Sequence, residues 1–420
     1  MTGTMLDLSA TRQQSLAKLI SAWLSQRGVT EDAPAVVREV EILVPGRPGV
    51  LDVLAEVGGR TAHAVLGLHS PGAEPRSIGG GDDPGLGQFE DEAGPCLVVD
   101  ALRDAELAPL VLSTVTGDPV PEVLSVGGDE GGVVLSFTDG RSLTVFPWVT
   151  DGPHPGIEML VALDEAGFNH LAAPVALWRR GGRDLGLVQE LLVGSAAGWA
   201  LALTSLRDLF GSGCAPEDAG GDFAFEARSL GTMTARMHLA LDRAFGRRSG
   251  QIADWAATAR AALEAHDPAW LRAPGALEAM AALQRIDARA AVIRTHGDFH
   301  LGRTARTDQG WVVADCLPAG YAAGSDEPSW RSPLADVADM AWSFHHVAAT
   351  AVSERDQLGR AEFVRLAGDW EARNRRAFLG GYLATAGIGG LVPPDRDVVR
   401  NLVAVFELQR AALRAGQSRR

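Results

Sequence analysis

The stretch RTHGDFHLGRTARTDQGWVVADCLPAG, residues 294–320, contains a His-Gly-Asp turn, a short hairpin and an aspartate on a strand. Glycine permits backbone geometry that other residues avoid, so Gly297 favours a tight turn that presents Asp298. The hairpin that follows places Asp315 on its second strand. The stretch therefore predicts a site in which a turn and a hairpin hold acidic groups.

The N-terminal half has the short alternating segments and turn signals of β-structure. Asp139 and Gly140 lie between two alternating segments, which is a strong hairpin signal. Strands are predicted over residues 36–45, 49–57, 61–70 and 185–194, a Gly- and Pro-rich loop over 69–88, and helices over 5–28, 102–115 and 155–168.

After Gly198 the apolar spacing becomes helical. Helices are predicted over residues 199–210, 223–245, 252–265, 276–290, 334–352, 355–384 and 395–414. We expect the β-structure of this half to be confined to residues 294–320. The chain is therefore predicted to be of the α+β class.

Composition excludes several classes of protein. A chain of 420 residues with 46% hydrophobic residues can form two or three domains, and its net charge of −15 disfavours nucleic acid and anionic membranes. The three cysteines have no metal-site spacing, and no export signal or membrane-spanning segment is evident. A cytoplasmic protein that binds a small molecule is the expectation.

Five segments resemble, in order and at similar spacing, the pattern of maltokinases and the related actinobacterial glucosamine kinases. They are GWALALTSLRDLF, GGDFAFEARSLGTMTARMHLAL, RTHGDFHLG, SPLADVADMAWSFHHVA and WEARNRRAFLGGYLATAGI, and the likeness runs from about residue 120 to the end. The resemblance implies a two-lobed protein-kinase-like (aminoglycoside phosphotransferase-like) fold. It further implies an N-terminal cap over residues 1–115, a β-rich N-lobe over 116–195 and a helical C-lobe over 196–420.

The resemblance implies that this chain keeps the residues that meet the acceptor sugar in these kinases. Asp298 matches the catalytic aspartate that orients or deprotonates the acceptor hydroxyl, and His296 matches a packing and hydrogen-bonding post beside it. A capped turn without catalytic use is the alternative for both. Glu407 and Trp370 are candidate contacts for the acceptor, a sugar or amino sugar, although Trp370 could equally be a core residue and Glu407 a surface carboxylate.

The cofactors implied are ATP and Mg²⁺, and the metal side of the hairpin departs from the family pattern. Five residues after Asp298 the family has a Gln or Asn that binds magnesium, whereas this chain has Arg303. A guanidinium has only donors and a permanent charge, so it cannot be a metal ligand. Asp315 remains a possible ligand, the acidic residue expected two positions later is Leu317, and we expect Arg303 and Asp315 to form an ion pair where magnesium would bind.

The nucleotide site that the resemblance implies in the N-lobe also departs from the family pattern. Thr144 occupies the place of the lysine that clamps the ATP phosphates, and the single lysine of the chain, Lys18, lies far upstream. Glu158 matches the usual glutamate partner of that lysine, although a solvated helix carboxylate is the simpler interpretation. Gly131 belongs to a glycine-rich turn that could approach a phosphate, and such turns also occur without ligands.

Two hypotheses follow. The first is a homologue of these sugar phosphotransferases with an eroded ATP and Mg²⁺ site and impaired or absent activity. The alternative is an active ATP-dependent sugar kinase, with glucosamine or maltose as acceptor, in which an unusual site binds the nucleotide and Arg303 could pair with phosphate oxygens. A partner from the trehalose or glycogen pathway is implied only by the resemblance to maltokinases.

Overall fold

The computed structural model describes residues 4–26, 34–80, 85–129, 132–218, 222–316, 330–355 and 360–417. The chain divides into two compact units. In their described parts, the N-terminal unit comprises Met1–Glu158 and Ala172–Val193, and the C-terminal unit comprises Met159–Leu171, Gly194–Pro318 and Glu327–Arg420. The finer division into a cap, an N-lobe and a C-lobe stays a prediction.

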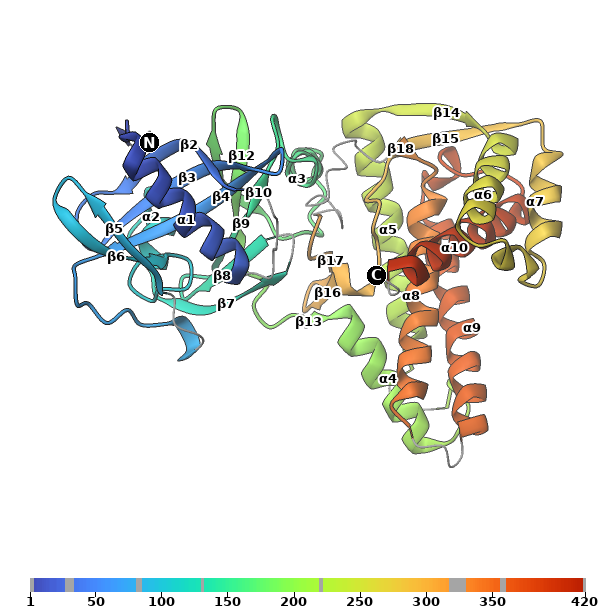
Figure 1. Ribbon diagram of the computed structural model, residues 1–420. Helices are drawn as coiled ribbons and strands as arrows, with labels where there is room; N and C mark the ends of the chain where they lie inside the picture. Colours follow the sequence, from blue (N-terminus) through green and yellow to red (C-terminus); the bar gives the residue numbers. More distant parts are fainter. Residues whose placement is uncertain are drawn as a thin grey trace. The chain divides into compact units, whose positions relative to one another are not determined.

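The N-terminal unit contains a seven-stranded antiparallel sheet in the order β1-β2-β3-β4-β6-β5, with β10 paired to β4 (Figure 1). Its elements are β1 (Thr4–Met5), α1 (Ala10–Gln26), β2 (Val36–Val44), β3 (Gly49–Val57), β4 (Arg60–His69), η1 (Ile78–Gly80), β5 (Gly85–Asp91), β6 (Gly94–Asp100), α2 (Ala108–Thr116) and β10 (Trp148–Val149). Helix α1 buries Leu16, Ile20 and Trp23 in a shared core with the sheet. Each such side chain contributes about 1.5–3 kcal/mol through removal from water.

A second antiparallel sheet of this unit has the order β11-β12-β9-β8-β7. Its strands are β7 (Val123–Asp129), β8 (Gly132–Phe137), β9 (Arg141–Val145), β11 (Pro174–Arg180) and β12 (Arg183–Glu190), and α3 (Pro155–Glu165) follows β10 along the chain. The predicted hairpin around Asp139 and Gly140 is confirmed, because β8 pairs with β9 and Gly140 has φ +82°.

Three predictions for this unit are wrong in part. The first helix begins at Ala10 rather than at residue 5, because Thr4 and Met5 pair with β2. The predicted loop over residues 69–88 includes η1 and the start of β5, and the helix predicted from residue 102 begins at Ala108, where Pro109 suits a first turn.

The C-terminal unit is mainly helical and carries two small antiparallel sheets, in the orders β13-β16-β17 and β14-β15-β18. Its elements are β13 (Ala196–Ala197), α4 (Gly198–Ser212), α5 (Ala224–Phe245), β14 (Arg247–Gln251), α6 (Ile252–His266), η2 (Pro268–Arg272), α7 (Ala276–Gln284), β15 (Arg289–Arg294), η3 (Leu301–Arg303), β16 (Thr304–Thr307), β17 (Gly310–Val313), β18 (Trp330–Arg331), α8 (Leu334–Ser353), α9 (Arg360–Ala384), η5 (Ile388–Gly390) and α10 (Arg396–Gln417).

All seven helices predicted for this unit occur, but the β-structure is more extensive than expected. Residues 289 and 290, predicted as the end of a helix, begin β15, and β14 pairs with this strand. The start predicted for α9 at residue 355 is not observed, since the described helix begins at Arg360 and residues 356–359 lie outside the described ranges.

Two glycines allow α5 and α9 to cross at very short distance. A Cβ on Gly231 would overlap the carbonyl oxygen of Phe378, and a Cβ on Gly381 would overlap that of Arg228. Gly198, at the start of α4, similarly lies against the backbone of Leu301 in the hairpin region. These close approaches fix the spacing of α5 and α9 and place the start of α4 against Leu301. In the described part of the chain, no helix is long and apolar enough to cross a membrane.

Candidate active site

Asp336, in the first turn of α8, anchors the His-Gly-Asp turn. Its carboxylate accepts the backbone N–H of His296 (2.8 Å) and of Gly297 (3.0 Å), and His238 of α5 donates from Nε2 (3.1 Å). Burial would raise the pKa of Asp336, but these donors, led by His238, lower it below its usual value. Gly297 has φ +84°, so the expectation that glycine permits this turn is confirmed.

His296 connects the turn to the hairpin. Its Nδ1 accepts the backbone N–H of Asp298 (3.4 Å), and its Nε2 therefore donates to the carbonyl oxygen of Asp315 (2.8 Å). Burial lowers the pKa of His296, which fits a neutral ring. The ring is a packing and hydrogen-bonding post, as the sequence predicted, and its contribution to catalysis stays a prediction.

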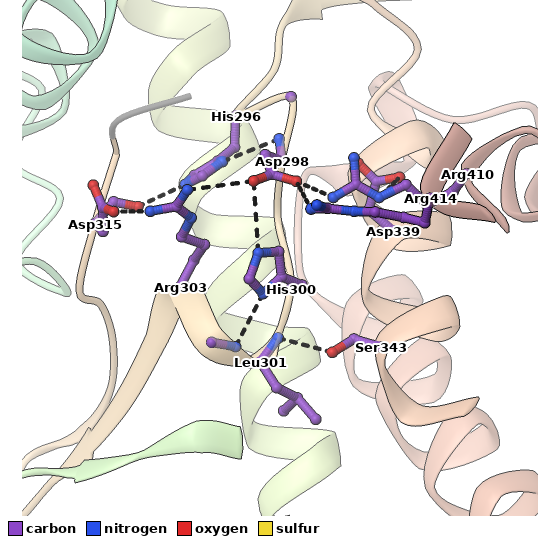
Figure 2. A network of polar contacts seen from close by, with 12 residues as sticks. His296, Asp298, His300, Leu301, Arg303, Asp315, Asp339, Ser343, Arg410 and Arg414 are labelled. Carbon is purple, nitrogen blue, oxygen red and sulfur yellow. Dashed lines mark hydrogen bonds and ion pairs between the residues drawn. The ribbon is translucent and has the colours of Figure 1, made fainter. Parts of the chain in front are cut away.

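Asp298 lies among guanidinium groups (Figure 2). Its Oδ1 accepts from Arg410 and from Arg414 (2.8 Å), and its Oδ2 accepts from Arg303 (3.4 Å). The Nε2 atom of His300 lies 3.6 Å from Oδ2. A carboxylate offers about four lone-pair directions, and these three guanidinium groups occupy most of those of Asp298.

Arg303 bridges the two acidic groups of the opening stretch. One amino group of Arg303 donates to Asp315 Oδ2, and the other donates to Asp298 Oδ2 (Figure 2). The ion pair predicted between Arg303 and Asp315 is thus observed. Leu317 lies outside the described residues, as does Gly131 of the predicted phosphate turn.

The described residues around the hairpin do not fit a magnesium ion. Arg303 is cationic and donates to Asp315, the carboxylate that the sequence offered as a possible metal ligand. Among the described residues, no group of three or more His, Cys, Asp or Glu side chains could hold a metal ion. Asp315 is accordingly an ion-pair partner here, and its assignment as a metal ligand stays a prediction.

A second ionic cluster joins α8, α9 and α10 beside this site. Arg375 donates to Glu371 (2.9 Å) and to Glu407, and His345 donates to Glu371 (3.1 Å). Burial raises the pKa of Glu407, while the hydrogen bond with Glu371 raises that of His345. Glu407 therefore already has a guanidinium bound to it, and its contact with an acceptor stays a prediction.

Trp370, the other predicted acceptor contact, is a core residue. Its ring is 1% exposed and packs with Phe223 and Phe344, and its indole N–H donates to Ser205 (3.0 Å). An aromatic side chain with its polar atom satisfied inside the core is explained by packing alone. Trp370 therefore fits the alternative of a core residue, and its contact with an acceptor stays a prediction.

The remaining predicted residues belong to the N-terminal unit or to the helix that leaves it. Thr144 is buried on β9, and its Cγ2 lies beside Gly132, next to the glycine-rich turn. Glu158 is exposed in the first turn of α3. Lys18 is exposed on α1. The assignment of Thr144, Glu158 and Gly131 to a nucleotide site stays a prediction.

The sequence interpretation missed Arg410, Arg414, Asp336, Asp339 and His238 as parts of this site. Arg410 and Arg414 are four residues apart on α10 and share one face with Glu407. Asp336 and Asp339 are three residues apart on α8. Spacing on an amphipathic helix was the available signal, but it does not show which side chain such a face meets.

The unit thus combines a turn that presents a buried aspartate, a hairpin and helix-borne polar groups. This combination agrees with a kinase-like fold. Two solved structures of glucosamine kinase share the fold at 21% identity. One, in complex with glucosamine, ADP and inorganic phosphate, has a TM-score of 0.66 over 95% of this chain and 94% of its own. A second crystal form has a TM-score of 0.67 over 97% and 95%.

Sequence relatives identify the family. The chain is 30% identical over 386 residues to glucosamine kinase of Streptacidiphilus jiangxiensis, covering 84% of this chain and 83% of the relative. It is 27% identical over 250 residues to glucosamine kinase of Mycolicibacterium smegmatis, covering 52% and 61%. No protein-family model matches the chain. The chain belongs to the glucosamine kinase family, and the predicted α+β, kinase-like fold is confirmed.

Proposed function

We propose that this protein is a sugar phosphotransferase homologue in which the acceptor side around Asp298 is kept and Mg²⁺-ATP phosphotransfer is impaired. The observation that carries the proposal is the bridge of Arg303 between Asp298 and Asp315. Magnesium ordinarily neutralises charge on the phosphate oxygens in phosphotransfer. A permanent cation between the two carboxylates opposes metal entry and occupies the acceptor aspartate.

The change at Thr144 supports the same proposal. A threonine hydroxyl neither reaches nor neutralises a phosphate as an ammonium does. Loss of one charge-stabilising donor typically lowers turnover by about a hundredfold to a thousandfold. Loss of the phosphate clamp together with a cation at the metal position should lower turnover further.

A second candidate, an active ATP-dependent sugar kinase, is favoured by the 30% identity to a curated glucosamine kinase. In that case Arg303 pairs with phosphate oxygens, as arginine fingers do. The acceptor in both candidates is a small sugar. A maltokinase activity, a partner from the trehalose or glycogen pathway, and a cytoplasmic location stay predictions.

Calorimetric titration of the purified protein with ATP, with and without Mg²⁺, tests the proposal directly. A coupled ADP-release assay with glucosamine, glucose and maltose then measures turnover. We expect ATP binding that does not tighten with Mg²⁺ and turnover close to background. Mg²⁺-dependent ATP binding together with clear turnover of any of the three sugars would refute the impairment and favour the active kinase.

The variant Arg303→Gln, alone and combined with Thr144→Lys, tests whether these two residues cause the impairment. We expect the double variant to gain Mg²⁺-dependent ATP binding. The matched control is Arg306→Gln, on the same hairpin, whose side chain pairs with Glu226 and does not touch Asp298 or Asp315. If the control gained binding as the double variant does, the effect would not come from the metal position.

A further inference from the structure

The ligand side of Asp298 presents guanidinium groups. Arg410 and Arg414 lie one turn apart on α10 and both reach the same oxygen, Oδ1, of Asp298 (Figure 2). The side chain of Asp298 is 4% exposed, whereas that of Arg414 is 31% exposed. A molecule that approaches from solvent therefore meets a cation before it meets the aspartate.

The carboxylates that an amino sugar would need already have cationic partners. Glu371 binds His345 and Arg375, and Glu407 binds Arg375. Asp339 is 2% exposed, and burial raises its pKa to about 8, so it is largely protonated at neutral pH. An ammonium group would have to displace a guanidinium from a half-buried pair, which is costly because it leaves that cation unpaired.

The cations of this cluster also repel one another. Burial and the neighbouring Arg414 lower the pKa of Arg410 to about 10. Burial lowers the pKa of Arg414 as well; Asp339 opposes this shift, and Arg303 adds to it. A second anion between Arg410 and Arg414 would relieve this repulsion and gain charge-assisted hydrogen bonds.

Three partly exposed aromatic rings of α4 and α8 form a small group. His346 of α8 stacks on Trp342 (4.9 Å between ring centroids) and lies 5.2 Å from Trp199 of α4. The charge of Arg414 contributes to lowering the pKa of His346, after burial and His345. Aromatic surfaces with a few charged groups are typical of small-molecule sites.

We infer that this site takes a sugar that bears an anionic group, a carboxylate or a phosphate, bound by Arg410 and Arg414, in preference to a cationic amino sugar. The inference rests on the proposed function only in that the acceptor hydroxyl is directed to Asp298. The guanidinium group of an arginine binds a carboxylate or a phosphate through two parallel N–H donors. Arg410 and Arg414 are thus assigned as specificity-determining residues.

Calorimetric titration without nucleotide, at neutral pH and low ionic strength, tests the inference with four sugars. Glucose is the neutral reference, glucosamine the cation, and glucuronate and glucose 6-phosphate separate the carboxylate from the phosphate. We expect one of the two anions to bind at least about tenfold more tightly than glucose, and glucosamine to bind more weakly than glucose. Tighter binding of glucosamine than of both anions would overturn the inference.

Two controls separate a sugar site from a general anion site. Inorganic phosphate should bind more weakly than the preferred anionic sugar; equal binding would overturn the assignment. In the wild type, added KCl should weaken the binding of the anionic sugar and leave that of glucose nearly unchanged. An anionic sugar whose binding is insensitive to salt would count against the arginines.

The variant Arg414→Gln should remove most of the preference for the anion over glucose. Its matched control is Arg400→Gln, on the same helix, where the side chain is exposed and pairs with Asp397. A preference that survives in Arg414→Gln would overturn the inference, and the salt titration of the wild type decides if this variant does not fold. No nucleotide is present, so Mg²⁺-dependent turnover would refute the proposed impairment without affecting this result.

Discussion

Two buried aspartates, on either side of the same turn, meet opposite surroundings. Asp336 is fully buried and is bound by two backbone amides and a histidine. Asp298 is almost as buried, but three arginines surround it. The first arrangement is satisfied by the fold itself and fixes the turn. The second concentrates charge around Asp298 beside the partly exposed Arg414, and the catalytic use of Asp298 stays a prediction.

The largest effect is expected for Asp336→Ala. The change leaves His238 and the amides of His296 and Gly297 without their acceptor inside the core. Removing one member of a buried network of this kind typically lowers the free energy of unfolding by about 3–5 kcal/mol. Urea denaturation followed by tryptophan fluorescence measures it. The control Asp369→Ala, on the exposed face of α9, should change stability by less than about 0.5 kcal/mol.

A smaller loss is expected for Asp298→Asn, about 1–3 kcal/mol, because Arg303 and Arg414 can rehydrate. Added phosphate should restore part of the stability of this variant, since an anion can replace the lost charge. Phosphate should not stabilise Asp336→Ala beyond its effect on the wild type. Equal responses of the two variants would remove the distinction between the two aspartates.

The third prediction concerns pH. Burial raises the pKa of Asp339 to about 8 in the folded protein. In the unfolded chain its pKa is about 3.9, so between these values unfolding releases a proton, and stability falls as the pH rises. The variant Asp339→Asn has no carboxyl group at this position, so it lacks this contribution to the pH dependence of stability. Its stability relative to the wild type should increase by about 1.4 kcal/mol for each pH unit between pH 5 and pH 7 and level off above pH 8.

For Asp336 we expect the opposite pH dependence of stability. Its pKa is lowered in the folded state, so its contribution is present above the usual carboxyl pKa and is lost as the pH falls below it. Thermal denaturation at a series of pH values compares the two groups. A stability difference between Asp339→Asn and the wild type that stays constant from pH 5 to pH 8 would contradict the assignment of Asp339 as a buried, largely protonated acid.

The smallest effect is expected for Tyr382→Phe. The change removes the hydroxyl that contacts His238 Nδ1 at 2.9 Å and leaves the packing of the ring unchanged. A loss of about 0.5–1.5 kcal/mol is expected in urea denaturation, as for one intramolecular hydrogen bond. A loss as large as that of Asp336→Ala would mean that the tyrosine, rather than the aspartate, holds this part of the turn.

The sequence predicted the long periodic elements well and the short ones poorly. Helices such as α4, α5 and α8 have an apolar stripe over many turns, so local spacing identifies them. β14 and β18 have five and two residues, and both pair with β15, which is distant from each along the chain. Such strands depend on tertiary pairing and leave almost no local pattern.

The candidate site was likewise predictable only where its residues lie close together in the sequence. The turn around Gly297 and the pair of Arg303 with Asp315 follow from residue types close together in the chain. Arg410 and Arg414 meet Asp298 across more than a hundred residues of sequence. Nothing local distinguishes them from arginines on a solvated helix face, so only the packing of α10 reveals their role.

The glycine crossing of α5 and α9 has a consequence for mutational scanning. Gly231 is two turns before His238 on α5, and Gly381 directly precedes Tyr382 on α9. Any side chain at either glycine would push the helices apart and pull His238 and Tyr382 out of register. A library screened for ligand binding would therefore rank these two positions beside the arginines of the site, although neither touches a ligand. Sensitivity at glycines 231 and 381 would report the spacing of two helices, and site maps drawn from such screens should be corrected for it.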